Sequence, residues 1–182
     1  ERYEVLKGPA SISLGPIGAG GIINTVTKVP EADRFIGYEL RGDHFGSFAA
    51  ELDANLGDIS GNETVLLRIS GAYRDFQFDA RETRRQTVAV RPVAIVNVGP
   101  STSIKASASY TRTETNPNSG FPLLSNGEIL QQIGTDTFTG SANGEAIAED
   151  QYYEAVFNHE FLDNLKLSLP FNSRTVPHWL IG

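Results

Sequence analysis

Alternation of apolar and polar residues is the feature that most constrains this chain. Between Phe48 and Leu56 apolar residues stand at every second position, with Ala49 and then acidic or amide side chains between them. A period of two places these sets on opposite faces of an extended strand. Similar runs occupy 36–41, 65–74, 88–98, 104–111 and 153–161. The sequence therefore predicts an all-β fold, an up-and-down antiparallel meander of about six strands between residues 35 and 169.

The connections between these runs alternate in length. Those after the second and fourth runs are short, whereas those after the third and fifth are long. Membrane β-barrels show this pattern, with short turns at one end and longer loops at the other. A soluble antiparallel sheet with one wet face has the same alternation of residues, so both interpretations stand at this point. In the barrel, Leu52, Leu56, Leu67, Ile69, Val90 and Val96 face lipid, and Glu51, Asp53, Arg68 and Lys105 face inward.

Composition excludes several classes of function. The chain has no cysteine, which excludes disulfides, thiolate metal sites and cysteine nucleophiles. Its formal net charge of −7 argues against nucleic-acid binding, which needs a basic surface. No apolar run approaches the length of a membrane helix. The histidines lack ligand spacing on one element, and no nucleophile motif is present, so we expect no catalytic, metal or cofactor site. The histidines are His44, His159 and His178.

The first thirty residues carry the most specific motif. They read ERYEVLKGPAS and, after a short gap, GGIINTVTKVP. This closely resembles the end of the plug domain of TonB-dependent outer-membrane receptors, in the form typical of the siderophore-receptor branch. The chain departs from the family at Ser13-Leu14-Gly15, where many members have Leu-Tyr-Gly. The resemblance is detailed over these thirty residues and extends to the rest only as a pattern.

The resemblance implies a division of the chain and a function. Residues 1–30 would be the C-terminal part of the plug domain, and residues 31–182 the first strands of a truncated transmembrane β-barrel. The implied function is TonB-dependent uptake of a ferric siderophore in the cell outer membrane, without enzymatic activity. The implied partners are the siderophore, outer-membrane lipid and the TonB energy-transducing complex, the last through a missing N-terminal segment. The alternatives are a small complete outer-membrane barrel of about eight strands and a soluble β-rich binding domain.

The resemblance also assigns individual residues. Cations and carboxylates of the plug would contact the barrel wall, and glycines would form its tight turns. The strands at 2–6 and 22–28 are expected side by side against the concave face, with Lys7 near inward carboxylates. Contact residues are Arg2, Glu4 and Lys7, and turn glycines are Gly8, Gly15, Gly20 and Gly21.

Two further features concern strand ends. Tyr73, Phe76, Phe78 and Tyr110 fit an aromatic girdle at the membrane surface, although Phe76 and Phe78 also fit a ligand-contacting loop. The segment from Pro170 to Gly182 loses the alternation, so we interpret this end of the chain as truncated or altered.

Overall fold

The structure is a computed structural model that describes residues 2–6, 22–77, 83–116, 144–162 and 164–181. Among these residues no helix is long and apolar enough to cross a membrane. Their strands are β1 (Arg2–Leu6), β2 (Ile22–Val26), β3 (Phe35–Gly42), β4 (Phe48–Asp58), β5 (Val65–Gln77), β6 (Arg84–Asn97), β7 (Thr102–Thr115), β8 (Ala146–Leu162) and β9 (Leu165–Ile181).

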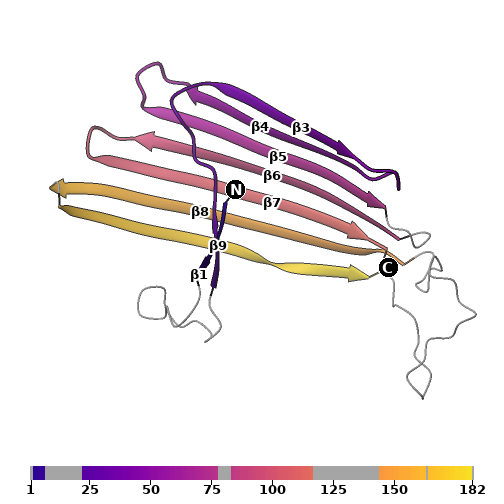
Figure 1. Ribbon diagram of the computed structural model, residues 1–182. Helices are drawn as coiled ribbons and strands as arrows, with labels where there is room; N and C mark the ends of the chain where they lie inside the picture. Colours follow the sequence, from indigo (N-terminus) through magenta and orange to yellow (C-terminus); the bar gives the residue numbers. More distant parts are fainter. Residues whose placement is uncertain (1, 7–21, 78–82, 117–143, 163, 182) are drawn as a thin grey trace, which may run out of the picture.

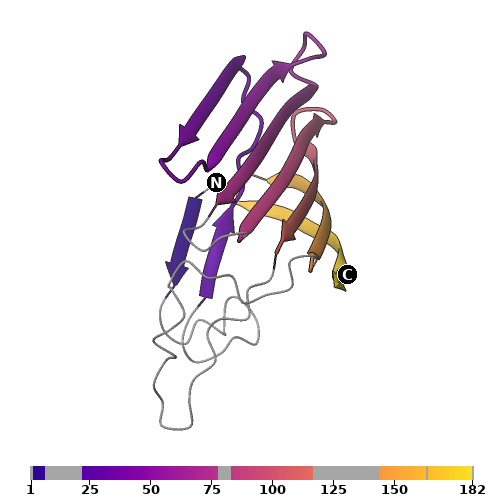
Figure 2. The ribbon, with the colours of Figure 1, turned by 90° about the vertical axis from the view of Figure 1, so that its right-hand side faces the viewer.

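These strands form two sheets (Figure 1). In the smaller sheet β1 pairs with β2, with Arg2 opposite Val26 and Leu6 opposite Ile22, as predicted. In the larger sheet β3 to β9 pair with their neighbours in chain order, all antiparallel. The predicted meander is therefore confirmed. Strands β3 and β9 form the two edges of this open sheet, which Figure 2 shows to be curved.

The strands of the large sheet are connected at two ends. One end, called the turn end, holds the connections at 59–64, 98–101 and 163–164. The other, called the loop end, holds those at 43–47, 78–83 and 116–145, of which only the last is long. The prediction of a long connection after the third run is therefore wrong, because β5 and β6 extend to Gln77 and Arg84 and leave only six residues between them. The segment from β2 joins the sheet at the turn end, because Phe35 at the start of β3 pairs with Asn55 near the end of β4.

The strands are longer and more numerous than expected. The large sheet has seven strands rather than about six, because the apolar residues from Leu165 to Leu169 begin a further strand, β9, which continues through Pro170 to Ile181. Proline lacks the N–H donor of a ladder, and strands tolerate it at an edge or a bulge. Here β9 is an edge strand of the described sheet, and its register with β8 shifts between Glu149 and Gln151. Alternation is thus a weaker guide to where these strands end than to where their centres lie.

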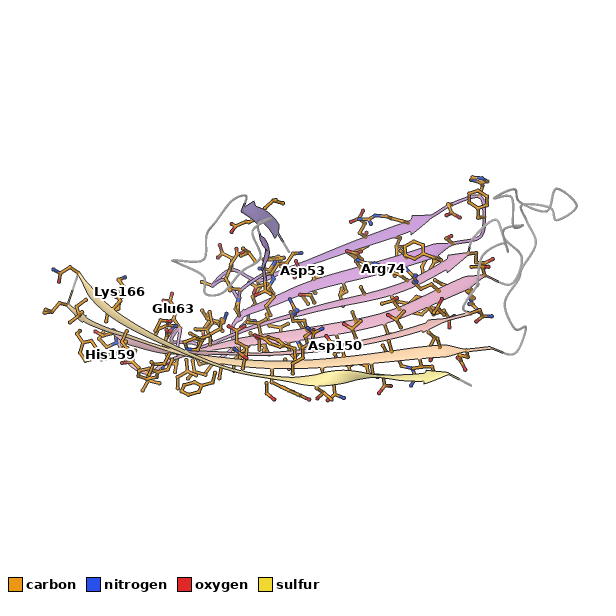
Figure 3. The ribbon with its side chains drawn as sticks, turned by 90° about the horizontal axis from the view of Figure 1, so that it is seen from below. Asp53, Glu63, Arg74, Asp150, His159 and Lys166 are labelled. Carbon is orange, nitrogen blue, oxygen red and sulfur yellow. The ribbon has the colours of Figure 1, made fainter. Side chains whose placement is uncertain are left out.

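The two faces of the large sheet have opposite character. The inner face carries Asp53 and Arg74, and the two-stranded sheet lies on this side (Figure 3). The outer face presents large apolar side chains that no other described element covers, among them Ile36, Leu52 and Val90 with 70%, 49% and 41% exposure. The predicted lipid-facing residues lie on this outer face by register, except Leu56, which lies at a bulge between Asn55 and Gly57. The soluble alternative required a closed apolar interior, which the described residues do not form.

The apolar band of the outer face ends at aromatic residues on the side of the loop end. Farther toward that end, outer-face side chains are charged and paired, as in Arg84 with Asp75 and Arg112 with Glu149. Phe76, in contrast, lies on the inner face opposite Arg85, and Phe78 lies outside the described residues. The last aromatic residues of the band are Phe48, Tyr73, Tyr110, Tyr153 and Phe171 in β4, β5, β7, β8 and β9.

This aromatic boundary crosses the strands obliquely. The pairing that starts at Phe48 leads across the sheet to Leu180 in β9, nine residues beyond Phe171. Along the strands this offset is nine residues of about 3.3 Å each, and across the sheet it extends over five strand spacings of about 4.8 Å. The strands are therefore tilted by roughly 50° from the normal to the aromatic boundary. Strands of outer-membrane barrels tilt by about 35–45° from the membrane normal. A flat membrane boundary on tilted strands requires such an oblique course, whereas a soluble sheet does not.

Candidate functional site on the inner face

Charged side chains on the inner face are paired across neighbouring strands. Glu51, Asp53, Arg68 and Lys105 all lie on this face, as predicted. Most of the pairs are partly exposed, and such pairs contribute little stability but keep a surface hydrated. The pairs are Arg74–Glu51 at 2.6 Å, Lys105–Glu154 at 2.9 Å and Arg174–Asp150 at 2.7 Å.

Residues 28–34, which we call the linker, run from β2 to β3 over the turn end of the inner face. The sequence marks this stretch as polar and places a proline at its centre, which disfavours continued pairing with a strand. Most of its residues are exposed, but Pro30 is buried. The linker therefore lies against the wall, and Arg68, Asn55 and Gly57 of the wall lie closest to its backbone.

Arg68 in β5 is the first of these wall residues. Its Nε and Nη2 donate to the two carboxylate oxygens of Asp53, both at 2.8 Å. Its Nη1 donates to the carbonyl oxygen of Val29 at 2.8 Å and to Glu31 Oε1 at 3.2 Å. The guanidinium also lies 4.9 Å from the ring centroid of Phe35. The planar fork of arginine suits this bidentate geometry, and with 6% exposure Arg68 joins wall and linker in a nearly dry position.

Asn55 in β4 is the second wall residue and is 1% exposed. Its Oδ1 accepts from the backbone N–H of Glu31 at 3.2 Å, and its Nδ2 donates to the carbonyl oxygen of Glu31 at 2.9 Å and to that of Asp33. The side-chain amide thus pairs with the linker backbone as a neighbouring strand would. Burial of an amide is costly unless it is hydrogen-bonded, and here both ends of the amide have partners.

Gly57 is the third wall residue, and its lack of a side chain lets the linker approach. Its φ of +63° lies in the left-handed region that favours glycine. A Cβ at this position would overlap the carbonyl oxygen of Ala32 and lie 2.9 Å from Cγ of Arg34. Arg34 in turn donates to the carbonyl oxygen of Asp58 at 2.8 Å.

Lys28 makes a more exposed contact at the start of the linker. Its Nζ donates to Asp53 Oδ2 at 2.6 Å, so that Asp53 binds Lys28 and Arg68 together. The side chain of Lys28 is 42% exposed, compared with 8% for that of Arg68. One carboxylate therefore connects an exposed cation of the linker with a buried cation of the wall.

The plug–barrel contacts predicted from the sequence remain untested. The backbone of Arg2 and Glu4 lies in β1, and Glu4 is half-buried. The side chain of Arg2, and Lys7 altogether, lie outside the described part. The predicted turn glycines, Gly8, Gly15, Gly20 and Gly21, also lie outside the described residues.

Sequence reasoning missed the linker contacts that the structure shows. It assigned Asp53 and Arg68 to the inner face but gave them no partner. It left Asn55 without a role, although an amide within an otherwise acidic run was a signal. Gly57 was interpreted only as part of a turn cluster, because its closeness to Ala32 depends on a segment more than twenty residues away.

The histidines do not form a metal site within the described residues. Nδ1 of His159 lies 2.8 Å from the Thr102 hydroxyl, and His44 packs on Phe45. The side chain of His178 lies outside the described part. Within that part no group of three or more histidine, aspartate or glutamate side chains is placed to hold a metal ion.

Two curated proteins are similar to this chain in sequence. No family model matches the chain. The metal-pseudopaline receptor CntO of Pseudomonas aeruginosa PAO1 is 27% identical over 175 residues, which cover 93% of this chain and 24% of the receptor. CntO of P. aeruginosa UCBPP-PA14 is 31% identical over 117 residues, covering 62% and 16%. The chain thus spans about a quarter or less of the length of these curated relatives.

Solved structures match over nearly the whole chain. The ferripyoverdine receptor of the P. aeruginosa outer membrane, bound to ferripyoverdine, has a TM-score of 0.87 at 21% identity, covering 100% of this chain and 24% of that one. The siderophore receptor PiuA of Acinetobacter baumannii has a TM-score of 0.78 at 21% identity, covering 91% and 24%. The described sheet therefore has the fold of part of the barrel in these receptors. More specifically, its fold is that of TonB-dependent outer-membrane siderophore receptors, and the resemblance seen in the first thirty residues is confirmed.

Proposed function

We propose that this chain is part of an outer-membrane receptor that takes up a metal–siderophore complex with energy from TonB. Residues 1–30 form the end of its plug, and residues 31–182 form the first strands of its barrel. The receptor binds and transports its ligand and catalyses no reaction.

The observation that carries this proposal is the contrast between the two faces of the large sheet. The outer face exposes large apolar side chains within an oblique aromatic boundary, which suits lipid. The inner face holds paired charges and a linker that leads to a second sheet. A barrel whose lumen contains another part of the same chain needs both features. A small complete barrel has no use for the linker contacts, and a soluble domain would bury the outer apolar residues.

The similar proteins support a metal chelate as the ligand. The names of the solved receptors specify ferripyoverdine and ferric catecholate, whereas that of the curated relative specifies metal-pseudopaline. We favour a ferric siderophore, because the plug motif has the form of the siderophore-receptor branch and a solved receptor that matches the whole chain is bound to ferripyoverdine. A receptor for a chelate of another transition metal is the second candidate, and sequence identity to CntO favours it.

Uptake by the full-length receptor tests both candidates. Cells that lack the receptor would be compared with cells that produce it, with and without a functional TonB, using siderophores loaded with radioactive iron, nickel or zinc. We expect uptake of an iron chelate that requires both the receptor and TonB. Uptake of nickel or zinc chelates in preference to iron would establish the second candidate. If cells that lack the receptor took up every chelate as fast as cells that produce it, this result would contradict the proposed function.

A further inference from the structure

Two of the contacts between the linker and the wall differ sharply in exposure. The first is the ion pair between Lys28 and Asp53, in which the lysine side chain is 42% exposed. The second is the set of hydrogen bonds from Asn55 and Arg68 to the backbone of the linker, made by side chains that are almost wholly buried. The two kinds lie next to each other, because Asp53 binds both Lys28 and Arg68.

These contacts differ in how they resist separation. An exposed ion pair is weak and screened by salt, so it opens and closes readily. Buried hydrogen bonds are costly to break, because the separated groups lose their partners without gaining water. Within the linker, the carbonyl oxygens of Val29, Glu31 and Asp33 all have buried wall donors. Breaking one of these bonds leaves the others in place, so the backbone from 29 to 33 is held as a unit.

We propose that Asn55, Gly57 and Arg68 form a fixed anchor that keeps residues 29–33 of the linker on the wall while the plug moves, so that the movable part of the plug ends at Lys28. This inference rests on the proposed function, because a plug that moves during transport belongs to that function. Tension on the chain from its N-terminal side reaches Lys28 before it reaches Val29. The exposed ion pair therefore opens first, and the anchor bears the load.

Accessibility of a buried linker position tests the anchor without any transport. The chain has no cysteine, so Pro30→Cys provides a single reactive thiol within it, at a buried position. The full-length receptor in outer-membrane vesicles would be labelled with a maleimide. Asn55→Asp keeps the size of the side chain but turns carboxylate oxygens toward the carbonyls of Glu31 and Asp33. We expect it to raise the labelling rate at least tenfold. The matched control, Asn158→Asp, lies on the same face but bonds to Ser168 of the neighbouring strand instead of the linker, so we expect no change.

Glycine substitutions give a second test with unaltered polar groups. Gly57→Ala would push the linker away, because its Cβ overlaps the carbonyl oxygen of Ala32. Gly61→Ala is the control. Gly61 has a φ of +81°, but no atom of the described residues lies within 4 Å of the place its methyl group would take, so the substitution brings the strain without the contact. We expect faster labelling, and faster trypsin cleavage at Arg34, only in Gly57→Ala. The shifted gel mobility of unheated barrels confirms folding in every variant. Equal rates in Asn55→Asp, Gly57→Ala and their controls would overturn the anchor.

Labelling during transport locates the boundary of the movable part. In energised cells supplied with ferripyoverdine, or with whichever iron-loaded siderophore the uptake assay identifies, we expect labelling of Thr27→Cys to rise severalfold while labelling of Pro30→Cys stays at its resting rate. An equal rise at both positions would show that the linker leaves the wall, which would overturn the anchor. If the receptor transports no chelate, the proposed function fails, whereas the resting comparisons still decide whether the anchor exists.

Discussion

Neighbouring residues of β5 show how differently the two faces of the sheet are built. Ile69 lies on the outer face among other apolar residues, and Ser70 lies on the inner face opposite Asp53 and Arg91. In a soluble protein the apolar side would be covered by a core. In the proposed receptor lipid takes the place of that core, and the hydrogen bonds between strands hold the wall together. The inner face would thereby be released from packing a core, and it could hold the polar contacts that the proposed plug requires.

The largest effect should come from a charge placed on the outer face. Ile69→Arg puts a guanidinium in the lipid-facing band, where such a substitution costs about 2–4 kcal/mol near the membrane midplane. Ser70→Arg, one residue further, puts the same group on the hydrated face and should cost much less. Denaturant unfolding of the full-length receptor in phospholipid bilayers measures both. Equal losses of stability would mean that the two faces do not meet different solvents.

Arg68 and Arg74 sharpen the comparison within the inner face. Arg68→Met leaves the Val29 carbonyl without the guanidinium donor and removes the bidentate partner of Asp53. The loss of a buried charge-assisted hydrogen bond corresponds to about 2 kcal/mol. Arg74→Met breaks a more exposed pair with Glu51 and should cost well under about 1 kcal/mol. Hydrogen exchange of the linker amides would detect the difference, and similar protection in both variants would contradict it.

The faces were predictable from the sequence because alternation is a local property. The run from Phe48 to Leu56 specifies which side chains share a face, whatever strand lies beside it. The length of β9 was not predictable in this way. Its alternation fails near Pro170 and Pro177, and the strand is recognisable only from its pairing with β8.

The linker contacts were beyond local patterns for a related reason. Arg68 meets Val29 across 39 positions of sequence, and Asn55 meets Glu31 across 24. These residues come into contact only when the register of β3 on β4 brings Phe35 opposite Asn55. The sequence could identify a polar linker and inward charges, but only the folded sheet brings them together.

A smaller effect should locate the aromatic boundary. Tyr153 lies on the outer face where the apolar band of β8 ends, and Tyr152 lies on the inner face opposite Arg174. Tyrosine and tryptophan both favour the membrane surface, so Tyr153→Trp should leave stability nearly unchanged. Brominated lipids should quench the fluorescence added by Tyr153→Trp severalfold more than that added by Tyr152→Trp. The native Trp179 contributes equally to both, and its signal is subtracted with the unaltered receptor. Equal quenching would place β8 away from the membrane surface.

The smallest effect is expected in the loop at 43–47, which belongs to neither face. Asp43 Oδ1 accepts from the backbone N–H groups of Phe45 and Ser47, both at 2.9 Å. The hydrogen bond from the Ser47 backbone is the main reason that the pKa of Asp43 lies below its usual value. A carboxylate with a lowered pKa stabilises the folded loop at pH values above its unfolded pKa of about 3.9, and this contribution is lost as the pH falls through the lowered folded value.

Acidification should therefore loosen this loop. Between pH 7 and about 3 we expect the exchange protection of the Ser47 amide to fall, because protonation weakens the carboxylate as an acceptor. In Asp43→Asn the amide oxygen accepts the same hydrogen bonds but does not titrate, so its protection should stay constant over this range. Comparison of the two proteins at each pH removes the intrinsic pH dependence of exchange. A parallel fall in both would show that the loop responds to some other group, whereas a fall confined to the aspartate assigns the response to Asp43.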